Sequence, residues 1–137
     1  MSILKEQMDK IPVNATNGGL FYKTFFTVAP PEYSKFFGMD KINPADVPGM
    51  TKFQLLGQDF LRQINKFVDC ANNEDAFKKE IQQFVTNHKN YNVGPKELEK
   101  AEPAFMTFLE SMTGVTAEQR AAWHGFFVKF MQAVTAC

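Results

Sequence analysis

One of the two histidines in this chain, His88, lies at the end of an expected amphipathic helix, where an imidazole could bind a metal. His88 closes a stretch in which apolar residues recur every three or four positions, the spacing of a single helix face. Gly94 and Pro95 follow shortly after it and are typical helix-breaking residues. An imidazole at the end of an amphipathic helix can supply one axial bond to iron, copper, zinc or nickel. His88 therefore indicates a metal site without identifying the metal.

The aromatic composition narrows what could surround such a site. The chain has fifteen phenylalanines, three tyrosines and one tryptophan among its 137 residues. A composition of this kind is most often a packed core, and it also suits a large, flat, apolar ligand. The hydrophobic share of 45% and the charged share of 22% are otherwise those of an ordinary globular domain.

Charge, the length of apolar runs and the cysteine positions disfavour several kinds of partner and indicate where the protein works. The formal net charge is zero and no basic tract occurs, so we expect no nucleic-acid partner. No run approaches the roughly 18 apolar residues of a membrane helix, so we expect no membrane partner. Charges at Lys5 and Glu6 stand where a signal peptide needs apolar residues, and the prediction is a cytoplasmic protein. Cys70 and Cys137 lie too far apart in sequence to suggest a disulfide framework.

Other kinds of chemistry have no matching motif. The chain has no glycine-rich nucleotide loop, no Cys-x-x-Cys and no His-Glu-x-x-His. Zinc normally takes three or four protein ligands, which two histidines and two scattered cysteines do not easily supply. The second histidine, His124, follows Trp123 in an apolar helical pattern, and we expect it to be an ordinary helix-face or core residue.

The hydrophobic periodicity is helical throughout, which predicts an all-α fold. We expect six to eight helical segments in one domain over residues 1–137. Pro103 should kink one of these helices, and Thr116 with Gln119 has the form of a capping box. The expected helices cover residues 2–11, 20–29, 32–37, 44–47, 51–70, a stretch ending at 88, 95–112 and 117–134, with a loop over 14–19.

Four stretches of the chain together resemble the globin family, most closely its nematode type. Residues 21–36 look like the B helix and its corner, with the family's proline at Pro30 and its haem-stacking phenylalanine at Phe36. Residues 53–61 look like the nematode distal helix. His88 with its neighbours, followed by Val93 and Pro95, looks like the proximal histidine and the start of the next helix, and residues 120–123 resemble the last helix.

This resemblance implies a fold, a cofactor and an activity. The fold would be three helices over three around a haem, with a shortened N-terminal helix. The cofactor would be haem b, and the activity reversible binding of O2 for transport or storage, with CO and NO as further ligands. His88 would ligate the iron. The residues expected to contact the cofactor are Phe36, Phe53, Leu56, Phe60, Phe84, His88, Val93 and Phe105.

The distal side departs from the family pattern, because the position that is usually His or Gln falls on Leu56. Helical periodicity supports this register. If Gln58 were distal, Arg62 would face the ligand one turn later, whereas Leu56 is followed by Phe60. The register also places Gly57 where two helices approach closely. A leucine can neither ligate iron nor donate a hydrogen bond, so Tyr22 is the expected distal donor, above a pocket lined by Leu56 and Phe60.

The expected mechanism rests on one hydrogen bond on each side of the haem. The second ring nitrogen of His88 should donate to a carbonyl or hydroxyl one turn back, which fixes the tautomer. Tyr22 should donate to the gas ligand. Lys52, Tyr91 and Asn92 are candidates for contacts to the haem propionates.

Alternatives from other classes remain open. A haem enzyme or sensor acting on peroxide or NO is one, although Leu56 cannot serve as an acid–base group for peroxide cleavage. A haem-free helical binding module is another. Assembly into a homo-oligomer is also open, since a protein of zero net charge is prone to associate.

Overall fold

A computed structural model describes residues 2–89 and 93–136 of the chain. Within these ranges the protein is built from α-helices and two short 3-10 segments, with no strand, so the predicted all-α fold is confirmed. None of the helices in these ranges has the length and apolar character needed to cross a membrane. The elements are α1 (Ile3–Met8), α2 (Ala15–Val28), η1 (Pro31–Phe37), η2 (Pro44–Gly49), α3 (Thr51–Cys70), α4 (Glu74–Lys89), α5 (Pro95–Leu98), α6 (Ala101–Met112) and α7 (Ala117–Thr135).

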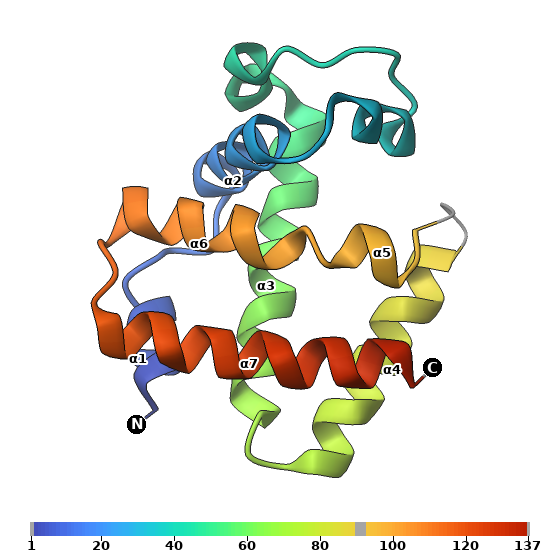
Figure 1. The fold of residues 1–137 in the computed structure, drawn as a ribbon. Coiled ribbons are helices and arrows are strands. Elements are labelled where there is room, and N and C mark those ends of the chain that lie inside the picture. Colours follow the sequence, from blue (N-terminus) through green and yellow to red (C-terminus); the bar gives the residue numbers. More distant parts are fainter. Residues whose placement is uncertain (1, 90–92, 137) are drawn as a thin grey trace.

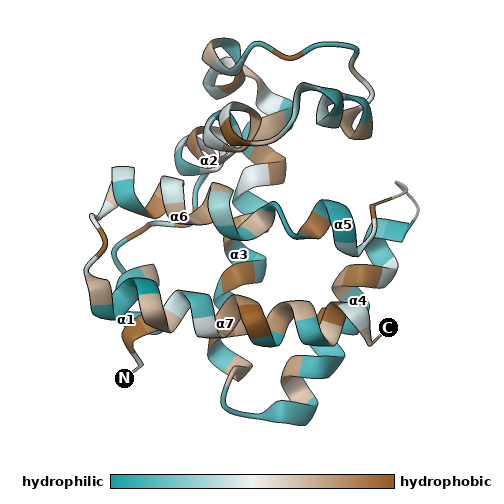
Figure 2. Ribbon diagram, in the orientation of Figure 1, coloured by the Kyte–Doolittle hydropathy of each residue, from teal (hydrophilic) through white to brown (hydrophobic). Residues whose placement is uncertain are grey.

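Helix α3 is the axis around which the other helices are arranged. In Figure 1, α7 and the α5–α6 pair cross α3, α4 returns beside it, and α2 lies across its N-terminal half. Hydrophobic and hydrophilic residues alternate along α3 and α7 in Figure 2, as expected for helices with one buried face. The predicted span of α3, residues 51–70, is confirmed, and α1 is the short N-terminal helix that the sequence indicated.

The start of α2 differs from the prediction. Residues 14–19 were expected to form a loop because they are rich in turn formers, but the helix begins at Ala15. Its N-cap is Asn14, whose Oδ1 accepts a hydrogen bond from the backbone N–H of Asn17 at 2.8 Å. Gly18 and Gly19 therefore lie inside the helix. A Cβ atom on Gly19 would lie 3.2 Å from the Cα of Pro48, so the space beside it is tight.

The closest backbone contact of the fold joins α2 to α3. A Cβ atom on Gly57 would lie 2.0 Å from the carbonyl oxygen of Gly18, and one on Gly18 would lie 2.4 Å from the carbonyl of Gln54. The predicted close approach at Gly57 is therefore confirmed. Because this contact fixes how α3 is rotated, it also decides which side chains of α3 turn inward.

The expected breaks in the C-terminal half are present. The helix starting at Pro95 is interrupted at Glu99 and Lys100, because Pro103 has no N–H to offer to the carbonyl of Glu99. At the start of α7, Thr116 Oγ1 accepts a hydrogen bond from the Gln119 N–H at 3.1 Å, and Gln119 Oε1 accepts one from the Thr116 N–H at 2.9 Å. The predicted capping box is thus confirmed.

Two hydrophobic clusters fill the interior. The larger one joins α2, α3, α4, α6 and α7 around the fully buried Trp123. The smaller one joins Ile42, Val47 and Phe53 beside η2. Tyr22 packs against both clusters, so its position marks the place where they meet.

Candidate functional site

The C-terminal end of α4 brings His88 to an aromatic cavity. The cavity has a volume of about 100 Å³, and its wall comes from α2, η1, α3, α4 and the start of α5. Most of the wall is apolar, with His88, Tyr22, Tyr33 and one carboxylate as its polar groups. The lining residues are Phe21, Tyr22, Phe25, Tyr33, Phe36, Phe37, Phe60, Phe84, His88, Val93, Glu97, Leu98 and Ala101.

The imidazole of His88 is held in a defined tautomer. Its Nδ1 lies 2.7 Å from the carbonyl oxygen of Phe84, one helical turn back. A carbonyl oxygen can only accept, so Nδ1 carries the proton and Nε2 keeps its lone pair. Burial lowers the pKa of His88, and the hydrogen bond to Phe84 opposes this only in part. The ring is therefore neutral at physiological pH, which is the form that binds a metal.

Tyr22 on α2 supplies a second polar group to the same cavity. Its ring packs at centroid distances of 5.2 Å from Phe21, 5.5 Å from Phe37 and 5.5 Å from Phe53. Burial raises the pKa of the phenol far above its ordinary value, and the negative charge of Asp59 adds to the effect. The hydroxyl is thus protonated at any physiological pH, and it has no hydrogen-bond partner among the described residues.

Other residues that the sequence pointed to also lie in this wall. Phe60 on α3 stacks on Phe21 with ring centroids 4.0 Å apart and planes 11° apart. Phe36 meets Tyr33 edge to face at 5.4 Å. The Phe84 ring lies 4.0 Å from the His88 ring. Val93 lines the same wall. The residues that the sequence pointed to and that share this cavity are Tyr22, Phe36, Phe60, Phe84, His88 and Val93.

Three predicted wall residues do not line this cavity. Leu56 is 37% exposed, because the Gly18–Gly57 contact turns its neighbour Gly57 toward α2 and leaves Leu56 on the flank of α3. Phe53 is fully buried in the smaller cluster, and it contacts the cavity wall through the rings of Tyr22 and Phe37. Phe105 is fully buried behind Phe60 and packs against Trp123.

Other wall residues were not anticipated from the sequence. Tyr33 and Phe37 lie on η1, Glu97, Leu98 and Ala101 on or after α5, and Phe21 and Phe25 on α2. Burial raises the pKa of Tyr33, and the carboxylates of Glu97, Glu32 and Glu99 raise it further. The spacing of Leu98 and Ala101 after Pro95 is a helical spacing that could have indicated an inward face.

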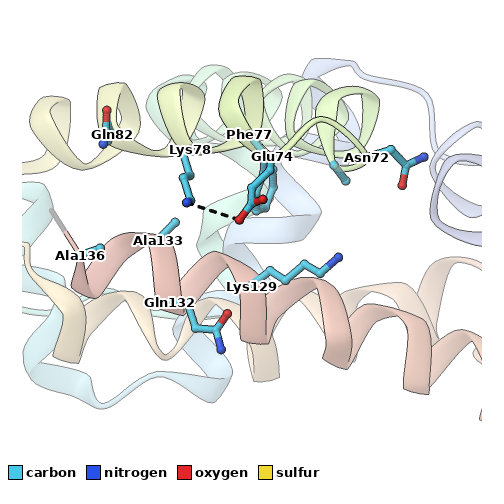
Figure 3. Close-up of a pocket in the computed structure, with 10 residues that line it drawn as sticks. Asn72, Glu74, Phe77, Lys78, Gln82, Lys129, Gln132, Ala133 and Ala136 are labelled. Atoms are coloured by element: carbon cyan, nitrogen blue, oxygen red, sulfur yellow. Dashed lines mark ion pairs between the residues drawn. The ribbon is translucent and has the colours of Figure 1, made fainter.

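A larger hollow elsewhere in the molecule lacks comparable chemistry. It has a volume of about 640 Å³ and lies between α4 and α7, as Figure 3 shows. Its polar side chains include Lys78 and Glu74, which form an ion pair at 3.4 Å, but its lining contains no histidine or cysteine. We therefore assign function to the smaller cavity around His88.

The second histidine is not part of either hollow. His124 on α7 is exposed, and its Nδ1 lies 2.9 Å from the Glu102 carboxylate on α6. This placement confirms the expectation of an ordinary helix-face residue. His88 is thus the one histidine of this chain that meets the cavity.

The donor set of the cavity decides which metal centre it could hold. The described residues contain no cluster of three or more His, Cys, Asp or Glu side chains suited to a metal ion. A single neutral imidazole in an aromatic wall instead suits a metal whose other ligands belong to a flat apolar macrocycle. The volume of about 100 Å³ is below the 300–1,000 Å³ of typical ligand pockets, so a macrocycle needs the aromatic side chains to move apart.

Comparison with known proteins identifies the family of the chain. A family model described as Globin matches residues 19–134 of the chain. The chain belongs to the globin family. It is 30% identical to a globin-like protein of Caenorhabditis elegans over 110 residues, which cover 80% of this chain and 69% of that protein. It is also 30% identical to a myoglobin of Nippostrongylus brasiliensis over 103 residues, covering 75% and 67% of the two chains.

Solved structures support the globin architecture. A high-resolution structure of a C. elegans globin-like protein matches with a TM-score of 0.84 at 23% identity, covering 96% of this chain and 89% of that one. A second crystal form of a C. elegans globin-like protein matches with a TM-score of 0.83 over 98% and 92% of the two chains. The predicted globin fold and the nematode-type resemblance are confirmed. Membership in this family makes haem the implied cofactor.

Proposed function

We propose that this globin binds haem b through His88 and binds O2 reversibly, in oxygen transport or storage. The observation that carries the proposal is the 2.7 Å contact between His88 Nδ1 and the Phe84 carbonyl. It leaves Nε2 as a free lone pair inside the aromatic cavity. Haem, when bound, supplies a ferrous iron with one coordination position for a small gas such as O2, CO or NO.

The proximal side would be held by α4. His88 Nε2 would ligate the metal while Nδ1 stays bonded to the Phe84 carbonyl, which keeps the ring from rotating and raises its basicity. The Phe84 ring, in contact with the imidazole, would cover the proximal face, and Phe36 with Val93 would pack on the porphyrin. This arrangement supplies one protein ligand and leaves the opposite side to the gas.

The distal side would be governed by Tyr22. Its hydroxyl is protonated and has no hydrogen-bond partner among the described residues, so it is available to donate to a ligand that carries partial negative charge. A hydrogen bond to a charged acceptor contributes about 1.5–3 kcal/mol, which corresponds to roughly 10- to 150-fold in affinity. Phe60 would add an apolar surface beside this donor.

The same group argues against peroxide chemistry as the main activity. Cleavage of peroxide is favoured by a group that both accepts and donates a proton near neutral pH. Burial and the charge of Asp59 hold the pKa of Tyr22 far above that range, so the phenol can donate but cannot act as a base. We therefore propose a binding protein and not an enzyme, with peroxidase or NO dioxygenase activity as a secondary possibility.

The first test is the absorption spectrum of the haem-loaded protein. We expect a Soret band and a five-coordinate ferrous form, both lost in His88→Ala. The matched control is His124→Ala, which changes the other histidine at an exposed position and should leave the spectrum unaltered. A Soret band of normal intensity in His88→Ala would remove His88 from the site.

The second test addresses the distal donor. Tyr22→Phe should raise the O2 dissociation rate by roughly 10- to 150-fold, because the hydrogen bond is worth about 1.5–3 kcal/mol. Tyr33→Phe is the matched control, since it removes a hydroxyl from another tyrosine of the same wall. An off-rate in Tyr22→Phe equal to that of the wild type would mean that the gas has another partner.

Three broader points belong to the same proposal. We propose that residues 1–137 form a single globin domain, that the protein works in the cytoplasm, and that neither nucleic acid nor membrane is its partner. Assembly into a homo-oligomer stays a prediction. Tyr91 and Asn92, which the sequence offered as propionate contacts, lie outside the described residues.

A further inference from the structure

Two neighbouring leucines on α3 are left in contact with water by the fold. Leu55 is 54% exposed and Leu56 is 37% exposed. Among the described residues, the other exposed large hydrophobic side chain is Val128 on α7. Apolar side chains scattered singly are ordinary on a protein surface, whereas contiguous ones mark an interaction site. The leucine pair is therefore the place to look for a partner.

Opposite charges flank the leucines symmetrically. Lys52 lies three residues before Leu55, and Asp59 lies three residues after Leu56. Steps of three and four residues place these four exposed side chains on one face of α3. The two charges are seven residues apart, which is roughly 10 Å along the helix, so they do not pair within one molecule.

Both charges can accept a further partner. Within residues 2–89 and 93–136, no carboxylate lies at ion-pair distance from Lys52, whose Nζ donates to the carbonyl of Phe37. Lys52 is also absent from the lining of the His88 cavity. Asp59 pairs with Arg62 through Oδ1 at 2.6 Å, and its side chain is still 71% exposed. The second carboxylate oxygen of Asp59 is thus open to another cation.

A second copy of the same helix, running antiparallel, has the groups that this face can bind. A two-fold axis passing between Leu55 and Leu56 places Lys52 of each copy opposite Asp59 of the other. It also places Leu55 of each copy against Leu56 of the other. Each charge lies about 5 Å along the helix from the axis, so the charges stay within reach of each other at the usual helix crossing angles.

We propose that this face of α3 is a self-association surface, on which two copies of the chain form a symmetric dimer through the leucines and two identical ion pairs. Specific stable interfaces bury about 1,200–2,000 Å² in total, and one helix face is smaller, so we expect a weak dimer with a dissociation constant of about 0.1 mM. The inference does not depend on the proposed haem binding, because none of the four residues lines the His88 cavity.

The test is sedimentation velocity of the full chain over a range of concentrations up to about 1 mM. Lys52→Glu and Asp59→Lys should each raise the dissociation constant at least about tenfold, because each variant alone places like charges opposite each other. An equal mixture of the two variants should associate like the wild type, since both contacts then join opposite charges. The matched control is Lys66→Glu, which makes the same change of charge at an exposed position farther along α3.

A second pair of variants tests the leucines. Leu55→Gln should weaken association, whereas Val128→Gln, which removes the exposed apolar side chain on α7, should leave it unchanged. Helical circular dichroism checks that each variant keeps its fold. A wild type that stays monomeric at about 1 mM, or two charge variants that do not associate when mixed, would overturn the proposal. Either result would leave His88 as the proposed haem ligand, because haem uptake is measured by the Soret band.

Discussion

The α1–α7 junction and the His88 cavity differ in whether their polar side-chain atoms have hydrogen-bond partners within the protein. At the junction, Gln7 is fully buried and all of its polar atoms are paired. Its Oε1 accepts from Trp123 Nε1 at 2.7 Å, and its Nε2 donates to Thr113 Oγ1 at 2.9 Å and to the Gly114 carbonyl at 3.2 Å. The network ties the N-terminal helix to the corner between α6 and α7.

Around the cavity, polar groups lack such partners. Among the described residues, no side chain or carbonyl accepts from the Tyr22 hydroxyl, and His88 bonds through Nδ1 alone. Elsewhere on α3, outside the lining of the cavity, the Nε2 of Gln63 is also buried without a partner in the same described part of the chain. Because a polar group without a partner in an apolar wall is costly, the unpaired hydroxyl of Tyr22 is typical of a site whose partner is a ligand. The comparison therefore separates polar groups that stabilise the fold from those that are available for binding.

The largest effect on stability should come from replacing Gln7, whose side chain makes the buried hydrogen bonds of the α1–α7 junction. Gln7→Met keeps the length and flexibility of the side chain but leaves Trp123 Nε1 without an acceptor. Loss of these hydrogen bonds should cost about 2–3 kcal/mol of unfolding free energy. Urea denaturation of the haem-free protein measures this cost. Gln82→Met is the matched control on an exposed surface of α4 and should change stability by less than about 0.5 kcal/mol.

If Gln7→Met were as mild as the exposed control, the paired network would not stabilise the fold. The distinction between the two regions would then rest on geometry alone. An unchanged dependence of the unfolding free energy on urea is also expected, since the substitution should not alter the surface exposed on unfolding.

An intermediate effect should appear at alkaline pH, and it comes from Tyr22. Burial raises the pKa of this phenol in the folded protein above the unfolded value of about 10. The folded state therefore retains a proton that the unfolded state releases. Stability is fully present below about pH 10 and falls as the pH rises above it, by up to about 1.4 kcal/mol per pH unit from this group.

Removing the hydroxyl should remove that part of the pH dependence. Haem-free Tyr22→Phe should be at least as stable as the wild type near neutral pH, because no protein hydrogen bond is lost, and should lose less stability above pH 10. Denaturation midpoints followed from about pH 8 to 11.5 compare the two proteins. Parallel curves would mean that the phenol is more solvated in the folded state than its burial indicates.

How far the sequence predicts this molecule depends on whether the deciding contact is local. The span of α3, the capping box at Thr116 and the carbonyl partner of His88 depend on residues within one or two turns, and each was predicted correctly. The start of α2 was predicted incorrectly, because glycine is usually a turn former. At Gly18 the glycine instead allows close contact with α3, whose backbone would lie 2.4 Å from a Cβ atom at that position.

The wall of the cavity is the part that local patterns describe least well. Leu56 and Phe60 are one turn apart on α3, yet Leu56 is 37% exposed and Phe60 lines the cavity. The rotation of α3 that separates them is set by the contact with Gly18, 38 positions before Leu56 in the numbering of the chain. Glu97 and Tyr33 meet for a similar reason, since no periodicity relates η1 to α5.

The smallest effect should come from Gln63. Replacing it with methionine should raise the free energy of unfolding, whereas the same replacement at Gln7 should lower it. Gln63→Met removes a buried N–H that has no partner among the described residues and replaces it with an apolar side chain of similar length. Since an unpaired buried donor costs free energy, the haem-free protein should gain up to about 1 kcal/mol of unfolding free energy. A loss as large as that of Gln7→Met would show that the Gln63 amide is paired in solution.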